Sequence, residues 1–136
     1  MALTGVDKGV VVRGAGIGLA VLVPPVAIVR ALLGNDDDSP LWTIVPLAFL
    51  LAFPLAGGVA ARRAPTAPLA HGALAAAAAF GVALLGGIVR NLVAGWSMTL
   101  AAFVTGVLFW QIAISLGVLG AYLAGRRRPS PEVRQP

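Results

Sequence analysis

Two arginines occupy matching places in this sequence and are its sharpest candidates for chemistry. Arg30 and Arg90 each complete an Ile-Val-Arg tripeptide near the end of a long apolar block. Charged residues inside a membrane span are costly and often functional, so the pair could form a cationic site for an anion. Arginine side chains close to the end of a span can instead reach lipid headgroups, and Arg30 can also meet the acidic run Asp36 to Asp38. The sequence leaves both interpretations open.

The single histidine, His71, lies at the start of the third apolar block. A metal site needs several ligands, but the chain has no cysteine and no Asp or Glu within an apolar block. The run Asp36 to Asp38 lacks the alternating acidic positions of a calcium loop and is typical of a solvated turn. We therefore expect no metal and no cofactor. For His71, a pH-sensing role and a plain position at the level of the headgroups both remain open.

Three polar residues follow one face of the fourth apolar block, namely Gln111, Ser115 and Tyr122. Residues at these spacings share a side of a helix. They could form hydrogen bonds between helices, or Gln111 and Ser115 could line a path for a substrate.

Other classes of function are disfavoured by what the sequence lacks. It shows no nucleophile–base pair, no phosphate-binding loop and no carboxylate within a span for proton coupling. Its basic residues flank the apolar blocks, which does not indicate nucleic-acid binding. We therefore predict that the protein is not an enzyme and has no nucleic-acid partner.

The elements that must position these residues follow from composition. The 136 residues are 59% hydrophobic and only 11% charged, too apolar for a water-soluble domain of this size. Four blocks reach the length of about 20 residues needed to cross a bilayer. They span residues 14–33, 41–61, 69–92 and 98–124, and we interpret the first as a retained helix rather than a signal peptide. Residues 126–136 are predicted to form a basic, disordered tail.

The basic residues predict the orientation of this four-helix transmembrane domain. Of the ten, only Arg30 and Arg90 fall on one side of the membrane, and the rest fall on the other. That other side receives Lys8, Arg13, Arg62, Arg63, Arg126, Arg127, Arg128 and Arg134. The positive-inside rule then places both termini in the cytoplasm. The preference for Ala, Gly, Pro, Val and Arg is typical of a GC-rich bacterial genome, so we expect a multi-pass protein of a bacterial plasma membrane.

An internal repeat divides the chain into two tandem helical hairpins. The first and third blocks share the closing Ile-Val-Arg, and the second and fourth each begin with a tryptophan and end in glycines and arginines. Small residues let transmembrane helices approach closely, which predicts a tight bundle with the third helix near its centre. The residues expected at helix contacts are Gly14, Gly18, Gly57, Gly58, Gly86, Gly87, Gly117 and Ala121.

The segment from Gly57 to Gly72 resembles a known group. A glycine pair ends the second block, a short basic turn follows, and His71-Gly72 opens the third. This pattern is similar to the uncharacterised YrzE-like four-helix bacterial membrane proteins. The resemblance implies a small integral membrane protein and supplies no catalytic residue.

These observations favour a non-enzymatic structural or accessory role in the bilayer. The small-residue faces would bind other transmembrane helices or further copies of the chain. The alternative is a transport or channel subunit in which Arg30 and Arg90 attract anions toward a path lined by Gln111 and Ser115. The accessory role predicts that Arg30 and Arg90 point to headgroups or to the acidic loop. The transport role predicts that they point into a shared water-accessible cavity.

Overall fold

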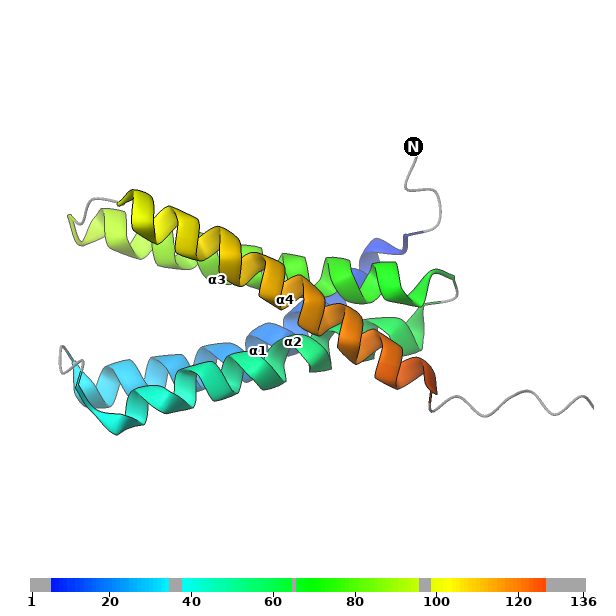
Figure 1. The fold of residues 1–136 in the computed structure, drawn as a ribbon, viewed down its shortest axis with the longest axis horizontal. Helices are drawn as coiled ribbons and strands as arrows, with labels where there is room; N and C mark the ends of the chain where they lie inside the picture. The colour runs from blue at the N-terminus through cyan, green and yellow to red at the C-terminus, as the bar shows by residue number, and fades with distance from the viewer. Residues whose placement is uncertain (1–5, 35–37, 65, 96–98, 127–136) are drawn as a thin grey trace, which may run out of the picture.

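Four long α-helices make up the computed structural model of the chain, which describes residues 6–34, 38–64, 66–95 and 99–126 (Figure 1). The helices are α1 (Lys8–Leu33), α2 (Ile44–Arg63), α3 (Pro68–Val93) and α4 (Leu100–Arg126), with a short 3-10 helix, η1 (Pro40–Thr43), before α2. The described residues contain no strand. Counting η1 with α2, all four helices are long and apolar enough to cross a membrane, so the all-α, four-helix fold class is confirmed.

The first helix begins at Lys8, earlier than the expected Gly14, because Asp7 caps it. The Oδ1 atom of Asp7 accepts hydrogen bonds from the backbone N–H groups of Gly9 at 2.8 Å and Val10 at 3.4 Å. Two donors at the helix start are thereby satisfied. The helix therefore extends through the basic residues that flank the apolar block.

The helices run alternately between two ends of the molecule (Figure 1). The end that holds the starts of α1 and α3 and the ends of α2 and α4 is called the basic end, because Lys8, Arg13, Arg62, Arg63 and Arg126 lie there. Toward the other end the α1–α2 hairpin and the α3–α4 hairpin diverge, and this is called the open end. Both α2 and α3 pack against all three other helices. The central position in the bundle predicted for the third helix is therefore occupied by both α2 and α3.

Small residues bring the helices into close contact toward the basic end. A Cβ atom added at Gly14 would lie 2.8 Å from the carbonyl oxygen of Ala56, and one at Gly57 would collide with the backbone of Gly117. Gly72 lies in the same way against Ala121. Helices in lipid associate through such close packing rather than through a hydrophobic driving force.

The other predicted packing residues divide into two groups. Gly18, Gly58, Gly117 and Ala121 lie at contacts between helices, as their small size indicates. At Gly86 and Gly87 the structure departs from the prediction, since an added Cβ atom would meet nothing within 4 Å. The cause is their place on the part of α3 that lies toward the open end, where the hairpins have already separated.

Five aromatic rings lie where the close packing stops. Phe49 of α2 is the hub, with ring centroids 4.4 Å from Phe53, 5.9 Å from Phe80 and 5.5 Å from Phe109. The ring of Trp110 lies 6.2 Å from that of Phe80. Aromatic side chains fill far more space than glycine or alanine, so we attribute the separation of α2 from the α3–α4 hairpin toward the open end to this aromatic cluster.

Candidate functional site

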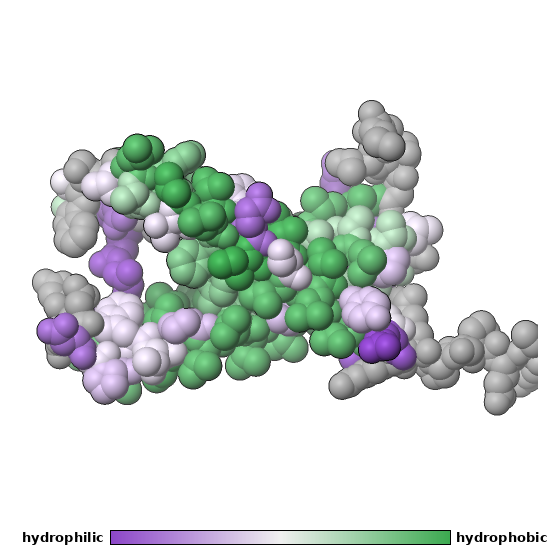
Figure 2. Space-filling model, viewed as in Figure 1, coloured by the Kyte–Doolittle hydropathy of each residue, from purple (hydrophilic) through white to green (hydrophobic). Residues whose placement is uncertain are grey.

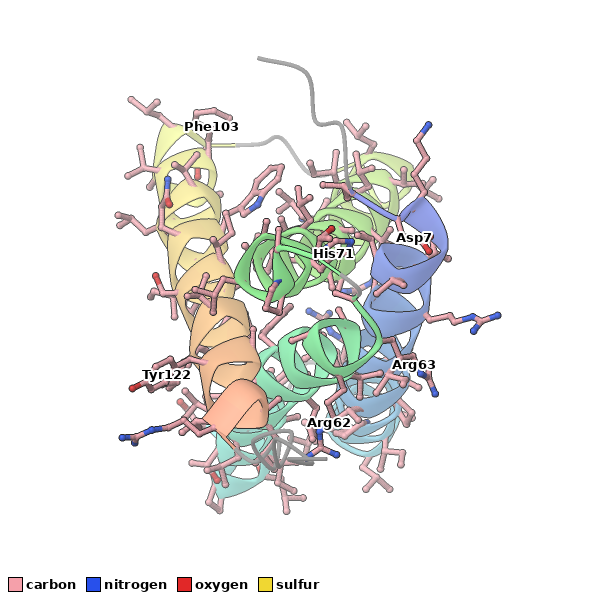
Figure 3. All side chains as sticks on the ribbon, turned by 90° about the vertical axis from the view of Figure 1, so that its right-hand side faces the viewer. Asp7, Arg62, Arg63, His71, Phe103 and Tyr122 are labelled. Carbon is pink, nitrogen blue, oxygen red and sulfur yellow. The ribbon has the colours of Figure 1, made fainter. Side chains whose placement is uncertain are left out.

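His71 is completely buried at the basic end and joins the starts of two helices (Figure 3). The backbone N–H of Asp7 donates to Nε2 of His71 at 2.9 Å. Because Nε2 must then carry a lone pair, the ring proton is on Nδ1, which lies 3.0 Å from the carbonyl oxygen of Ala67. A neutral imidazole thus makes one acceptor and one donor bond, and both of its polar atoms are satisfied.

The structure adds to both interpretations of the histidine that His71 has no exposed surface. A position at the level of the headgroups and a pH-sensing role both stay predictions. Asp7 caps α1 with its side chain and binds His71 with its backbone, so the pair links the start of α1 to the start of α3. Among the described residues there is no cluster of three His, Cys, Asp or Glu side chains that could hold a metal ion.

Arg30 and Arg90 line one shared groove between α1 and α3 at the open end. The groove has a volume of about 410 Å³, and its other lining residues are aliphatic side chains, alanines and glycines. Both arginines lie in the last turn of their helices and are exposed. The guanidinium carbon of Arg30 also lies 5.6 Å from the ring centroid of Trp42. We call this groove the arginine groove.

A second groove adjoins the arginine groove in the space between the diverging hairpins. It has a volume of about 590 Å³ and shares Leu22, Ala83 and Gly87 with the first. Phe49 and Phe80 of the aromatic cluster also line it. Figure 2 shows the hollow between the two hairpins at the open end, with hydrophilic side chains in it and apolar surface around the middle of the molecule.

The polar residues of α4 do not join the arginines. Gln111 and Ser115 are exposed and line neither of these grooves. The hydroxyl of Ser115 donates to the carbonyl of Gln111 at 2.9 Å, a bond within one helix and not between two. Tyr122 is 50% exposed and carries the guanidinium of Arg126 over its ring at 5.3 Å. The hydrogen bond of Ser115 is therefore not one of the predicted bonds between helices.

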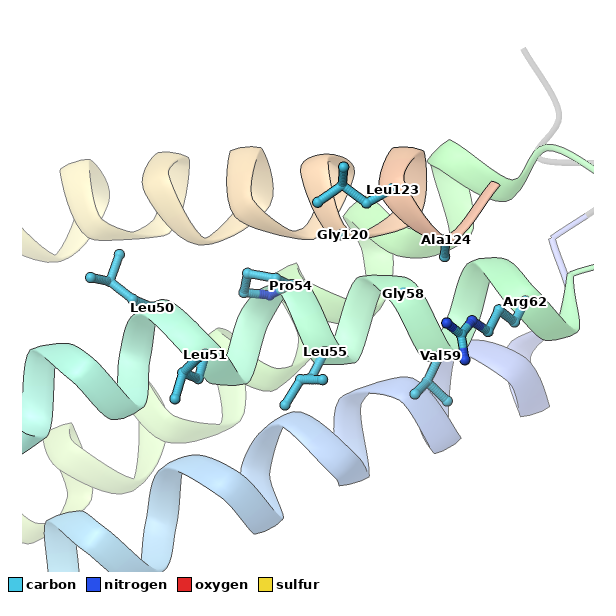
Figure 4. Close-up of a pocket in the computed structure, with 10 residues that line it drawn as sticks. All are labelled: Leu50, Leu51, Pro54, Leu55, Gly58, Val59, Arg62, Gly120, Leu123 and Ala124. Carbon is cyan, nitrogen blue, oxygen red and sulfur yellow. The ribbon is translucent and has the colours of Figure 1, made fainter. Parts of the chain in front are cut away.

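A third groove runs along α2 and α4 on the side that leads to the basic end (Figure 4). It holds about 320 Å³ and is lined by aliphatic side chains, Pro54 and the backbone of Gly58 and Gly120. Arg62 lies at one end of it. This groove marks where α4 rests on α2 through glycine contacts.

No family model, curated protein or solved structure matches the chain.

Sequence reasoning missed two of the residues that shape these sites. Asp7 precedes the first helix as an N-cap, and an aspartate directly before a helical run is a readable signal for such a cap. Trp42 pairs with Arg30 across the loop between α1 and η1, and no spacing rule in the sequence indicates this contact. The grooves themselves depend on how far the hairpins diverge.

Proposed function

We propose that this chain is a non-enzymatic accessory protein of a bacterial plasma membrane that acts by binding other transmembrane helices, including those of a second copy. Both termini would lie in the cytoplasm. The gathering of Lys8, Arg13, Arg62, Arg63 and Arg126 at one end supports this orientation, because basic residues are retained on the cytoplasmic side. The four helices long and apolar enough to cross a membrane support contact with lipid.

One observation carries the proposal: the half of α4 toward the open end has few neighbours. Every residue from Leu100 to Ile112 is exposed except Gly106, including the rings of Phe103, Phe109 and Trp110. In the α1–α2 hairpin at the same end, Val29 and Ala48 are buried. A helix of a complete bundle packs along its length on two neighbours, so this half of α4 has room for a further helix.

We also propose that this chain is related to the YrzE-like proteins. Two of its marks, Gly57 and Gly72, are positions where a Cβ atom would meet another helix, and a third, His71, is buried. Such positions are constrained by packing, which gives a physical reason for a shared pattern.

Site-specific photocrosslinking in native membranes tests the accessory role. A photoreactive residue at Leu108 of α4, 60% exposed, is compared with one at Leu32 of α1, 70% exposed. We expect discrete protein adducts from Leu108, either of twice the chain mass or with a second membrane protein, and only lipid adducts from Leu32. Lipid adducts alone at both positions would contradict the proposal. Reporter fusions to the two termini check the orientation independently.

A transport or channel subunit remains the second candidate because Arg30 and Arg90 share one groove. A transport role requires the two arginines to share one site. Gln111 and Ser115 do not extend this groove into a path, because neither residue lines it. In proteoliposomes this role predicts anion flux that the double substitution R30Q/R90Q abolishes. An absence of flux from the unmodified protein would eliminate it.

A further inference from the structure

The arginine groove combines two surfaces that one molecule could satisfy together. Along most of its length it is aliphatic, with Leu19, Val23 and Val26 on α1 facing Val82 on α3. At the open end it finishes in two guanidinium groups, Arg30 and Arg90. Both side chains come from the last turn of a helix, and these helices run in the same direction, so they lie at a similar depth.

The length of the groove matches one leaflet of a bilayer. From Leu19 to Arg30 a helix rises about 16 Å at about 1.5 Å per residue. Half of the hydrocarbon core of a bilayer is about 15 Å thick. The apolar part therefore spans the depth occupied by an acyl chain, and the arginines reach the layer of the phosphates. Its volume of about 410 Å³ also falls within the usual range for small-molecule sites.

Charge decides which lipid fits this groove. The planar guanidinium of arginine matches a phosphate through paired hydrogen bonds, and two such groups favour a headgroup with net negative charge. Of the acidic side chains that the structure describes, Asp7 and Asp38, neither lines the groove. A zwitterionic headgroup would bring its own cation near the arginines and gain less.

We propose that the arginine groove binds one anionic phospholipid from the leaflet at the open end. Its phosphate lies between Arg30 and Arg90, and one acyl chain lies along α1 and α3. Gly86 and Gly87 leave the space that the chain occupies, since nothing lies within 4 Å of either missing side chain. This inference does not rest on the proposed accessory role, because the site is complete within one chain.

The fluorescence of Trp42 serves as the probe of this site, because its ring lies next to Arg30 and belongs to η1, which precedes α2 at the open end. In a W96F/W110F background, reconstituted protein is titrated with phosphatidylglycerol or phosphatidylcholine brominated near the headgroup. We expect phosphatidylglycerol to quench Trp42 with an affinity about 25-fold higher, at about fivefold for each basic residue near an anionic lipid. The R30Q/R90Q variant should lose that preference. Inorganic phosphate in large excess should leave the preference of the unmodified protein for phosphatidylglycerol unchanged, since the acyl chain of the lipid contributes to binding.

Three matched variants separate the site from general attraction. R13Q/R63Q removes two exposed arginines from the basic end and should keep the preference. Gly87→Leu fills the groove without changing charge and should abolish it, whereas Gly81→Leu, also at an open glycine but outside the groove, should not. Equal quenching by the two lipids in the unmodified protein would overturn the proposal. So would displacement by phosphate, an equal effect of R13Q/R63Q, or an unchanged preference in Gly87→Leu. None of these outcomes depends on whether α4 recruits a helix.

Discussion

The basic end and the open end of this molecule are built from the same four helices and pack in opposite ways. At the basic end, glycines face alanines or other glycines, and backbones meet directly, as at Gly57 and Gly117. At the open end, Gly87 of α3 borders a space that the larger side chains of Leu22 and Phe49 also line. A small residue therefore closes a helix contact only where its partner is small as well.

The candidate residues His71, Arg30 and Arg90 differ between the two ends in a similar way. His71 is buried and bonded on both sides, so it belongs to the packing of the basic end. Arg30 and Arg90 are exposed and border a groove, so they remain available to a ligand. The proposals above therefore assign packing to the basic end and binding to the open end.

The largest expected effect on the unfolding free energy tests the packing of the basic end directly. Gly57→Leu would drive a side chain into the backbone of Gly117, and overpacking of this kind should cost about 3 kcal/mol or more. The matched change Gly86→Leu meets open space and should cost about 0.5 kcal/mol or less. Reversible unfolding in mixed detergent micelles measures both values. Equal losses would mean that the two ends are packed alike.

The next effect concerns the buried histidine. His71→Phe keeps much of the ring volume but leaves the backbone N–H of Asp7 without its acceptor. An unsatisfied buried donor costs about 1 to 3 kcal/mol, and we expect about 2 kcal/mol here. Ser115→Ala serves as the control, because it removes a single exposed bond within α4 and should change the unfolding free energy little. A loss for Ser115→Ala as large as that for His71→Phe would contradict the contrast.

Much of the fold could be predicted because its signals are local. Apolar blocks of sufficient length predict four spanning helices, and Ile-Val-Arg at Arg30 and Arg90 predicts that two helices end alike. The structure adds that both are followed by glycines with positive φ, 58° at Gly34 and 73° at Gly95, a backbone region that glycine adopts without steric cost.

The candidate site was less predictable because it depends on contacts between distant residues. Neither the sharing of one groove by Arg30 and Arg90 nor its width can be derived from spacing along one helix. We attribute the separation of the hairpins to the aromatic cluster, whose members Phe49, Phe80 and Phe109 come from three different helices. The burial of His71 likewise depends on how the start of α1 packs against the start of α3, which brings Asp7 to it.

A third change should narrow the cleft at the open end. Phe49→Leu removes the ring that contacts Phe53, Phe80 and Phe109, with a modest stability loss of about 1 kcal/mol. Without the ring of Phe49 the two hairpins should approach each other. Spin labels at Ile28 and Leu85, both exposed and on different hairpins, should then show a shorter mean distance. Labels at Val12 and Leu69, near the basic end, provide the control and should keep theirs. An unchanged distance at the open end would show that the cluster does not set the width.

The smallest expected effect compares two similar contacts at opposite ends. Arg30 lies 5.6 Å from the ring of Trp42 at the open end, and Arg126 lies 5.3 Å from the ring of Tyr122 at the basic end. Exposed cation–π pairs contribute about 0.5 to 1 kcal/mol, so Arg30→Gln and Arg126→Gln should each reduce the unfolding free energy by no more than this amount. In micelles free of anionic lipid the two losses should be equal. Adding phosphatidylglycerol should then stabilise the Arg126→Gln protein more than the Arg30→Gln protein, because only the former keeps both arginines of the groove. Equal stabilisation of the two variants would mean that the ends do not differ in their affinity for the lipid, and the division between a closed, structural end and an open, binding end would fail.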